Sequence, residues 1–315
     1  MLNLLLIGKD TKNNTFNESV YHVEKELSQK TNLAIWRDSG QIKDILKQIP
    51  FTPDFILIQN DIGGSLKPVV NGLSEIKIPA GIFIEDVHRF INRRREYIKS
   101  NNIQYIFPNY KRIFFKIYPE FKSRFCWFPH HINSEIFKDY GLPKEIDMLL
   151  MGAVNGGYPL REKIVKQFKK DPRFVYHRHP GYRKYTEEEK TQIFVNEKYA
   201  MEINRAKIFF TCGTARKFPV MKYFEVPGCR TLLLAPQLKD LDDLGFIPGE
   251  HYVRITKDDF YKKAEYYLKH EDERNRIADQ GYQFVQTQHT TKKRVEQLIT
   301  KIEEILGKHI ESPDL

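Results

Sequence analysis

The feature that most constrains the fold is a series of short, almost wholly apolar segments, each followed by glycine or polar residues and then by a helical pattern. Leu2 to Ile7 is the first of these segments, and Gly8 ends it. A strand that is apolar at every position is buried on both faces, as in a parallel sheet covered by helices. The alternation of such segments with helical ones predicts a parallel α/β fold.

The series runs twice, and a chain of 315 residues suits two domains. Between the two runs, around 141–146, the chain turns polar and contains a glycine and a proline. We expect two Rossmann-like, doubly wound domains facing a central cleft, residues 1–143 and 144–290. Residues 291–315 are expected to form a C-terminal helix that crosses back to the first domain. Ligands of such sheets bind beyond the carboxyl ends of the strands.

Two expectations concern single segments. FCWFP (125–129) is predicted to form a short strand after the strand IQYIFP (103–108). From Asp258 to Lys308 the pattern is mostly helical.

Charge, cysteine content and hydropathy indicate the kinds of partner and the cellular compartment to expect for the protein. The formal net charge of +10 favours anionic partners such as nucleotides, nucleic acid or an anionic surface, although a generally basic exterior would give the same number. Cys126, Cys212 and Cys229 are scattered without metal-type pairing, which indicates a reducing compartment. No apolar run approaches the roughly 20 residues of a membrane span, and the first residues lack the features of a signal peptide. A cytoplasmic location is therefore expected.

A glycine loop, GAVNGG (152–157), joins a predicted strand to a predicted helix. Glycines allow close approach of the backbone, and a helix N-terminus offers free N–H groups to an anion. The spacing matches neither the dinucleotide fingerprint nor the Walker loop. An anion site and a purely structural turn both fit this segment.

The segment TCGTARKFPVMKYFE (211–225) has a second loop of this kind. Gly213 opens the loop, and Pro219 suits the first turn of the following short helix. Arg216 and Lys217 are then expected beside the positive end of that helix, a favourable place for a diphosphate.

Glu225 is predicted near the end of the same short helix, where the negative end of the helix dipole disfavours an acid. If a nucleotide is bound nearby, this carboxylate can accept hydrogen bonds from both ribose hydroxyls. The alternative is a surface acid paired with Lys222, three residues earlier. The spacing alone leaves both open.

The second half of the chain resembles a known family. KYFEVPGCRTLLLAP, LDDLGFIPGEHYVRI and RIADQGYQFVQTQHTTKKRVEQL look like the C-terminal half of CgeB-like spore-protein glycosyltransferases, relatives of the glycosyl transferases group 1 with the GT-B fold. The resemblance covers roughly residues 147–307, and the first half adds only its strand order and pieces such as WFPHHINSEIF. The positions that carry it are Phe224, Glu225, Gly228, Gly249, Glu250, Gly281, His289, Thr290 and Arg294.

The resemblance implies that Glu225 binds the ribose of a nucleotide-sugar and that nearby basic residues bind its diphosphate, with UDP as the commonest carrier and no bound metal or other cofactor. Many relatives carry a second glutamate eight residues earlier, where this chain has Lys217. The stereochemical outcome is therefore left open. The residues predicted to bind the nucleotide-sugar are Glu225, Arg216, Lys217, Gly152, Asn155, Gly156, Gly213, Thr214, Lys222 and Phe224.

The first domain is expected to bind the acceptor. GIFIEDVHRF places Asp86 and His88 just past a predicted strand end. Either could act as the general base on an acceptor hydroxyl. A helix-starting acid and a surface histidine would fit the same pattern.

Two further charged motifs have simpler explanations. Asp240-Leu241-Asp242 spells a metal-binding pattern of a different glycosyltransferase fold, but we expect a solvated helix face here. NRRREY (92–97) could be a phosphate-binding patch, although the exposed face of a helix is favoured.

The sequence thus predicts a metal-independent hexosyltransferase that moves a sugar from a nucleotide-sugar to an acceptor hydroxyl, with a cell-surface or spore-surface glycan as acceptor. One alternative is a phage-type, DNA-modifying glycosyltransferase, which the net charge of +10 and the arginine-rich motif NRRRE would suit. Another is a non-catalytic nucleotide- or sugar-binding module, in which Lys217 marks lost chemistry.

Overall fold

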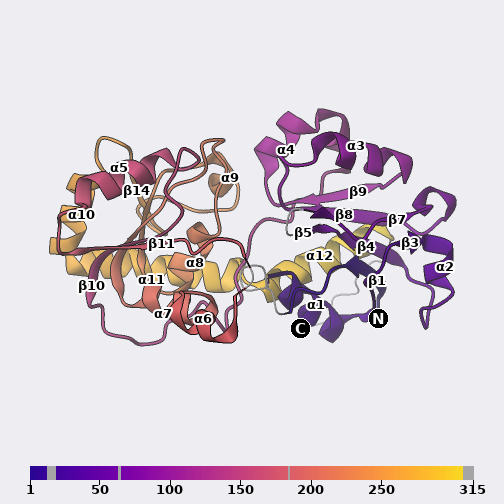
Figure 1. The fold of residues 1–315 in the computed structure, drawn as a ribbon, viewed down its shortest axis with the longest axis horizontal. Helices are drawn as coiled ribbons and strands as arrows, with labels where there is room; N and C mark the ends of the chain where they lie inside the picture. Colours follow the sequence, from indigo (N-terminus) through magenta and orange to yellow (C-terminus); the bar gives the residue numbers. More distant parts are fainter. Residues whose placement is uncertain (13–18, 63–64, 184, 308–315) are drawn as a thin grey trace. The chain divides into compact units, whose positions relative to one another are not determined.

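The computed structural model divides into two units, which are described separately (Figure 1). The first comprises residues 1–129 and 291–315, and the second comprises residues 130–290. The boundary predicted at 143/144 falls inside the second unit, because Ile132 and Phe137 pack into the core of that unit. The residues that the structure describes are 1–12, 19–62, 65–183 and 185–307.

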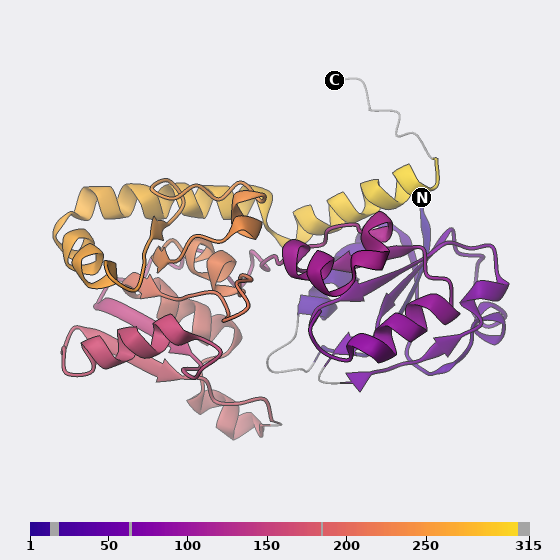
Figure 2. The same cartoon turned by 90° about the horizontal axis from the view of Figure 1, so that it is seen from above.

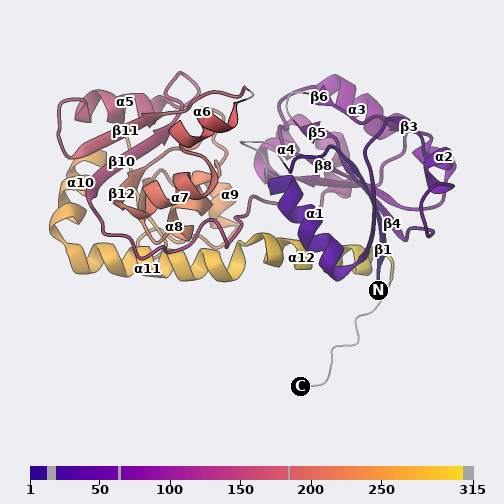
Figure 3. The ribbon, with the colours of Figure 1, turned by 60° about the horizontal axis from the view of Figure 1, so that its bottom comes forward.

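The first unit is built on a parallel sheet with the strand order β2-β1-β4-β8-β9. Its strands are β1 (Asn3–Gly8), β2 (Asn32–Trp36), β4 (Phe55–Gln59), β8 (Ala80–Ile84) and β9 (Tyr105–Pro108). Helices α3 and α4 lie on one face of the sheet, and α1 and α12 lie side by side on the other (Figures 1 and 3). The helices are α1 (Ser19–Lys30), α2 (Ile42–Leu46), α3 (Ile91–Ser100), α4 (Lys111–Ile117) and α12 (Thr291–Ile305).

Short elements complete this unit: β3 (Gly40–Gln41), β5 (Asp61–Ile62), β6 (Ser65–Leu66), β7 (Val70–Asn71), and the 3-10 helices η1 (Leu73–Glu75) and η2 (Pro119–Arg124). Helix α12 runs along the first unit (Figure 2), and its Val295, Leu298 and Ile302 enter the core beside Leu4 and Leu57. This apolar stripe explains why α12 packs on the first unit.

The second unit is built on a parallel sheet with the order β11-β10-β12-β13-β14. Its strands are β10 (Ile146–Gly152), β11 (Phe174–Arg178), β12 (Ala206–Phe210), β13 (Leu232–Ala235) and β14 (Val253–Arg254). The helices are α5 (Pro159–Phe168), α6 (Glu187–Gln192), α7 (Asn196–Asn204), α8 (Lys222–Gly228), α9 (Lys239–Asp242), α10 (Phe260–Lys269) and α11 (Glu271–Gln288).

Both faces of this second sheet are buried, as its apolar strands require. Along β10, Met148 and Leu150 join a core formed with α5 and α10. Leu149 and Met151, which point to the opposite face, join a core formed with α7 and α8. Successive side chains of a strand alternate between faces, so an unbroken apolar strand supplies both cores.

Two predicted segments differ from the structure. FCWFP runs alongside β9, where Cys126 and Phe128 donate backbone hydrogen bonds to Ile106 and Pro108, but only an isolated bridge from Phe125 to Ile106 forms. The short helix that contains Glu225 begins at Lys222, so Pro219 lies in the preceding loop and not in the first turn.

The motif NRRREY is not a uniformly exposed helix face. Arg93 is exposed, whereas Arg94 is fully buried. The Arg94 guanidinium donates to Asp61 Oδ2 over 2.6 Å and to the Tyr118 hydroxyl over 3.0 Å. Burial raises the pKa of Asp61, and the charge of Arg94 opposes that rise. A buried ion pair therefore lies at the end of β4.

Among residues 1–12, 19–62, 65–183 and 185–307, no helix has both the length and the apolar character that crossing a membrane would require.

Replacing Arg94 by Met is expected to lower the free energy of unfolding by about 3–5 kcal/mol, because it leaves the Asp61 carboxylate buried without its cation. Arg93→Met, on the exposed side of the same helix, should change it by less than about 0.5 kcal/mol. Both tryptophans, Trp36 and Trp127, lie in the first unit, so urea unfolding followed by tryptophan fluorescence reports on that unit. Equal losses in the two variants would contradict the role of the ion pair. Adding Asp61→Asn to Arg94→Met should restore part of the loss.

Candidate functional site

The strand order of the second unit determines where a ligand site is expected. The order reverses between β10 and β12, and the helices that follow these two strands, α5 and α8, pack on opposite faces of the sheet. Crevices at such switch points, beyond the carboxyl ends of the strands, are the usual ligand sites of doubly wound sheets. Here the loops that start after Gly152 and Phe210 meet, and Ala215 N–H donates to Gly157 O over 2.8 Å.

Four side chains gather at this point, and we call them the switch-point cluster: Arg161, Tyr199, Lys222 and Glu225. Arg161 is in the first turn of α5, and Tyr199 is on α7. Lys222 and Glu225 are the first and fourth residues of α8. The cluster therefore combines two cations, one acid and one phenol.

Arg161 is the most buried member, with 3% of its surface exposed. Its Nη1 donates to Ala153 O over 3.1 Å, and its Nη2 donates to Thr211 Oγ1 over 3.0 Å. The guanidinium thus ties the loop after β10 to the loop after β12. These acceptors are neutral oxygens, and the Arg161 Nε has no hydrogen-bond partner among the described residues. A buried guanidinium held in this way retains the charge to attract an anion.

Lys222, Glu225 and Tyr199 interact closely. Tyr199 OH donates to Glu225 Oε2 over 3.0 Å, and Lys222 Nζ lies 5.4 Å from the centre of the Tyr199 ring. Burial raises the pKa of Glu225, and the charge of Lys222 opposes that rise. Burial also lowers the pKa of Lys222 to about 8, with Glu225 opposing and Arg161 reinforcing the shift. Both Lys222 and Glu225 are partly exposed, so a ligand can reach them.

Gly152 makes room for the two cations. A Cβ at this position would lie 3.2 Å from Arg161 Nη1 and 3.3 Å from Lys222 Cε. The backbone also has a positive φ of 128° here, which side-chain-bearing residues rarely adopt. The glycine at the end of β10 is therefore needed for its conformation and for the close approach of both cations.

Glu225 does not lie at the negative end of its helix dipole, where the sequence placed it. The acid lies in the first turn of α8 rather than near its end. A carboxylate is favourable at the N-terminal end of a helix. The prediction of an unfavourable position was wrong because the helix starts three residues after Pro219.

The structure places the other predicted nucleotide-binding residues in several environments. Arg216 and Lys217 are exposed on the loop after β12, and Lys217 has a positive φ of 63°. Phe224 has no exposed surface and packs edge-on against Phe246 in the core. A side chain buried in this way cannot contact a nucleotide, so this position does not support the prediction made for Phe224.

The remaining predicted residues shape the two loops. Asn155 Oδ1 accepts a hydrogen bond from Gly157 N–H over 2.9 Å, and Gly156 is exposed. Thr214 N–H donates to Phe218 O over 3.1 Å. A Cβ on Gly213 would lie 2.9 Å from Phe218 O, so a larger residue would disturb the loop.

In the first unit, the segment that contains Asp86 and His88 follows β8, and hydrogen bonds with two side chains hold its backbone in place. Glu85 and Asp86 N–H both donate to Asp61 Oδ2, over 3.2 and 3.1 Å. Arg94 donates to Asp86 O and Arg89 O over 3.2 and 2.8 Å. The Asp86 carboxylate is 46% exposed and lies 3.5 Å from Arg89. The segment is fixed in the backbone while its acid remains accessible.

Asp240 does not lie on a solvated face as expected, because it is only 3% exposed, whereas Asp242 is exposed. Within the part of the chain that the structure describes, no group of three His, Cys, Asp or Glu side chains is arranged to hold a metal ion.

Arg161 is the residue that sequence reasoning missed. A signal was present, since an arginine follows the glycine loop within the first turn of a helix that begins with Pro159. In the sequence, that arginine is one of many basic residues at the start of a helix. Only the meeting of two loops distant in sequence distinguishes it.

Comparisons with known proteins give a family match for part of the chain. Residues 161–300 match a family model described as glycosyl transferase-like. A search of curated proteins finds no significant match.

Solved structures give the fold. The chain is similar to Anabaena Alr3699/HepE in complex with UDP-glucose (TM-score 0.62, 11% identity, 96% of this chain and 100% of that one). It is also similar to a glycosyltransferase from Rickettsia africae (TM-score 0.64, 9% identity, 98% and 100%). A third is sucrose-phosphate synthase from Thermosynechococcus elongatus (TM-score 0.65, 10% identity, 98% and 100%). The predicted GT-B fold is confirmed, whereas the narrower CgeB-like resemblance stays a prediction.

Gly152→Ala is expected to destabilise the protein by about 1–3 kcal/mol, because alanine is strained at this positive φ and its methyl group would press on Arg161 and Lys222. Gly156→Ala is the matched control in the same loop, since a Cβ there meets nothing within 4 Å. Urea unfolding followed by circular dichroism gives both values. The explanation fails if Gly156→Ala is as damaging as Gly152→Ala.

Proposed function

We propose that the chain is a metal-independent glycosyltransferase that moves a hexose from a nucleotide-sugar to an acceptor hydroxyl. The observation that carries the proposal is the buried Arg161 beside Lys222 and Glu225 at the switch point of the second unit. Two cations suit a diphosphate, and a partly exposed acid suits a pair of ribose hydroxyls. The glycosyl transferase-like match over residues 161–300 includes all four cluster residues.

In the proposed reaction, the acceptor oxygen attacks the anomeric carbon of the sugar, and the bond from that carbon to the diphosphate oxygen breaks. Negative charge develops on the leaving nucleoside diphosphate. Arg161 and Lys222, together with the loop N–H groups, would stabilise that charge, a role that metal ions fill elsewhere. The acceptor proton would pass to Asp86 or His88 as general base.

A UDP-sugar is the proposed donor. Its support is that the structures of Alr3699/HepE, which has the same fold, are described as complexes with UDP and with UDP-glucose. A glycan hydroxyl is the proposed acceptor. The DNA-modifying alternative loses part of its basis, because Arg94 in the arginine-rich helix is buried and ion-paired.

The donor is tested by a thermal-shift panel of nucleoside diphosphates and nucleotide-sugars. A ligand at a hundredfold excess over its Kd should stabilise the protein by about 2.7 kcal/mol. Glu225→Ala should abolish the shift, because the ribose loses its acceptor. Arg161→Gln should weaken binding about 10- to 100-fold, the loss of a charge-assisted hydrogen bond.

Arg216→Gln and Lys217→Gln are the matched controls, since each removes one exposed positive charge from the neighbouring loop. Small effects from both are expected. Loss of binding in these variants, with Arg161→Gln unchanged, would move the diphosphate site to the loop. Binding without any transfer or donor hydrolysis would favour a non-catalytic module.

Donor binding should weaken above pH 8. The pKa of Lys222 is lowered to about 8, so the cation that attracts the diphosphate is present below that pH and is lost above it. Apparent affinity should fall by up to about tenfold between pH 7 and pH 9. Calorimetry with the nucleotide-sugar selected by the panel measures this, because its diphosphate has no proton that titrates in the window.

Lys222→Arg keeps its charge throughout this range and should bind with little pH dependence. His179 also faces the cluster, but burial lowers its pKa from the ordinary value, so it titrates below the window. An unchanged pH profile in Lys222→Arg would show that another group titrates.

A further inference from the structure

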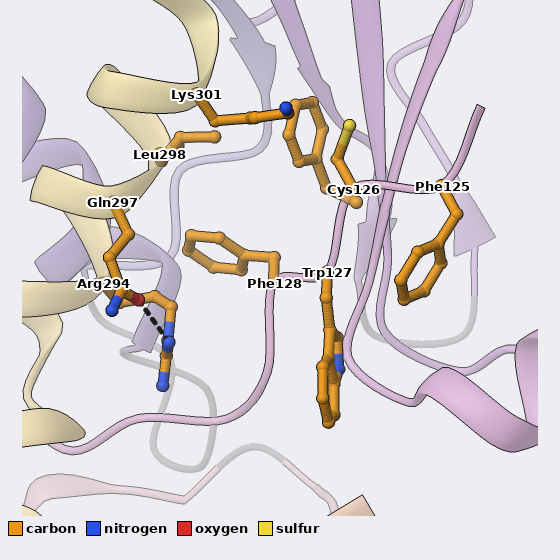
Figure 4. A pocket seen from close by; sticks show the side chains of 9 residues that line it. Phe125, Cys126, Trp127, Phe128, Arg294, Gln297, Leu298 and Lys301 are labelled. Atoms are coloured by element: carbon orange, nitrogen blue, oxygen red, sulfur yellow. Dashed lines mark hydrogen bonds between the residues drawn. The ribbon is translucent and has the colours of Figure 1, made fainter. Parts of the chain in front are cut away.

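The first unit contains a cavity that the proposed reaction does not use. It has a volume of about 360 Å³ and lies between α12 and the segment that follows η2 (Figure 4). Phe107, Trp127, Phe128 and Leu298 form apolar walls, and Arg294 and Lys301 are its two basic residues. The volume is within the range of small-molecule sites and far above the roughly 30 Å³ that one water occupies.

The apolar walls belong to the core of the first unit. Phe107, Phe128 and Leu298 have at most 7% of their surface exposed and belong to the same apolar cluster. Phe128 lies between Arg294 and Trp127, whose side chains point to the same side of it (Figure 4). Trp127 is fixed by a hydrogen bond of 3.1 Å from its indole Nε1 to Asn109 O.

The charges of the lining have one sign. None of the described residues that line the cavity is acidic. Lys301 pairs with Glu304, which is outside the lining, over 2.9 Å. Arg294 is 5% exposed and donates to Gln297 Oε1. Burial lowers the pKa of Arg294 to about 10, so its charge is costly in this environment. An anionic group in the cavity would therefore face two basic side chains and, among the described residues of the lining, no acidic one.

We propose that this cavity binds a small amphipathic anion, with an apolar body against Phe107, Phe128 and Leu298 and its charged group on Arg294. A fatty carboxylate and an alkyl phosphate share this chemistry. The site is independent of the proposed nucleotide site, which belongs to the other unit. The cavity is lined by two segments of the chain. Each adjoins a point where the chain passes between the units: one such point follows Phe128, and the other precedes Arg294.

Trp127 makes the proposal testable without an activity assay. The chain has two tryptophans, so Trp36→Phe leaves Trp127 as the only one. Titration with decanoate and with decyl phosphate, below their micelle concentrations, should give a saturable shift of its emission to shorter wavelength. Tighter binding of decanoate would indicate a fatty carboxylate as the ligand, and tighter binding of decyl phosphate would indicate an alkyl phosphate. 1-Decanol, which has the same chain without the charge, should bind at least tenfold more weakly.

Arg294→Gln in the Trp36→Phe background should weaken binding of the anions at least tenfold and leave decanol unchanged. Arg294→Lys keeps the charge and should retain binding if Arg294→Gln fails to fold. Lys262→Gln, which removes an exposed charge on α10, is the matched control and should bind as the parent does. The proposal is overturned if neither anion gives a saturable shift, if decanol binds as tightly, or if Lys262→Gln loses as much as Arg294→Gln.

Discussion

Burial of both faces of each parallel sheet is the constraint on which the rest of the structure depends. Side chains within the strands must be apolar, because helices cover them on both sides. Polar chemistry is thereby confined to the loops beyond the strand ends. Both sheets have their strands in the same relative order. The switch point therefore lies between β1 and β4 in the first sheet and between β10 and β12 in the second. The glycine loop after Gly152 and the loop after Phe210 are neighbours for this reason alone.

At the switch point of the second unit, Arg161 joins the two loops that follow β10 and β12. Its guanidinium holds both loops through neutral oxygens, so the hydrogen bonds fix its position without neutralising its charge. The cluster contains two cations and one carboxylate. A net positive charge in a partly desolvated site attracts an anion more strongly than it would in water. Gly152 permits this arrangement, because a side chain there would be strained at the positive φ and its Cβ would press on both Arg161 and Lys222.

The sequence was sufficient to predict the alternation of buried strands and helices in two domains and the positions of the two glycine loops, because these follow from local patterns. It was not sufficient to predict which of the basic residues lie in the switch-point cluster. Arg216 and Lys217 would lie beside the positive end of a helix only if that helix began at Pro219, whereas α8 begins at Lys222. The three arginines of NRRREY are equivalent in sequence, and only the contact with Asp61, 33 residues away, assigns Arg94 to the core. Such contacts depend on the tertiary fold.

The two units use one topology but differ in how the charges beyond their strand ends are balanced. Beyond the strand ends of the first unit lie Asp61, Glu85 and Asp86, and the buried Arg94 neutralises Asp61 while Asp86 remains accessible. Beyond those of the second unit, Arg161 and Lys222 outnumber Glu225. The excess of positive charge in the second arrangement favours a diphosphate, whereas a general base needs an accessible acceptor of protons, which Asp86 offers in the first. Under the proposed reaction, this difference in charge assigns donor binding to the second unit and proton transfer to the first.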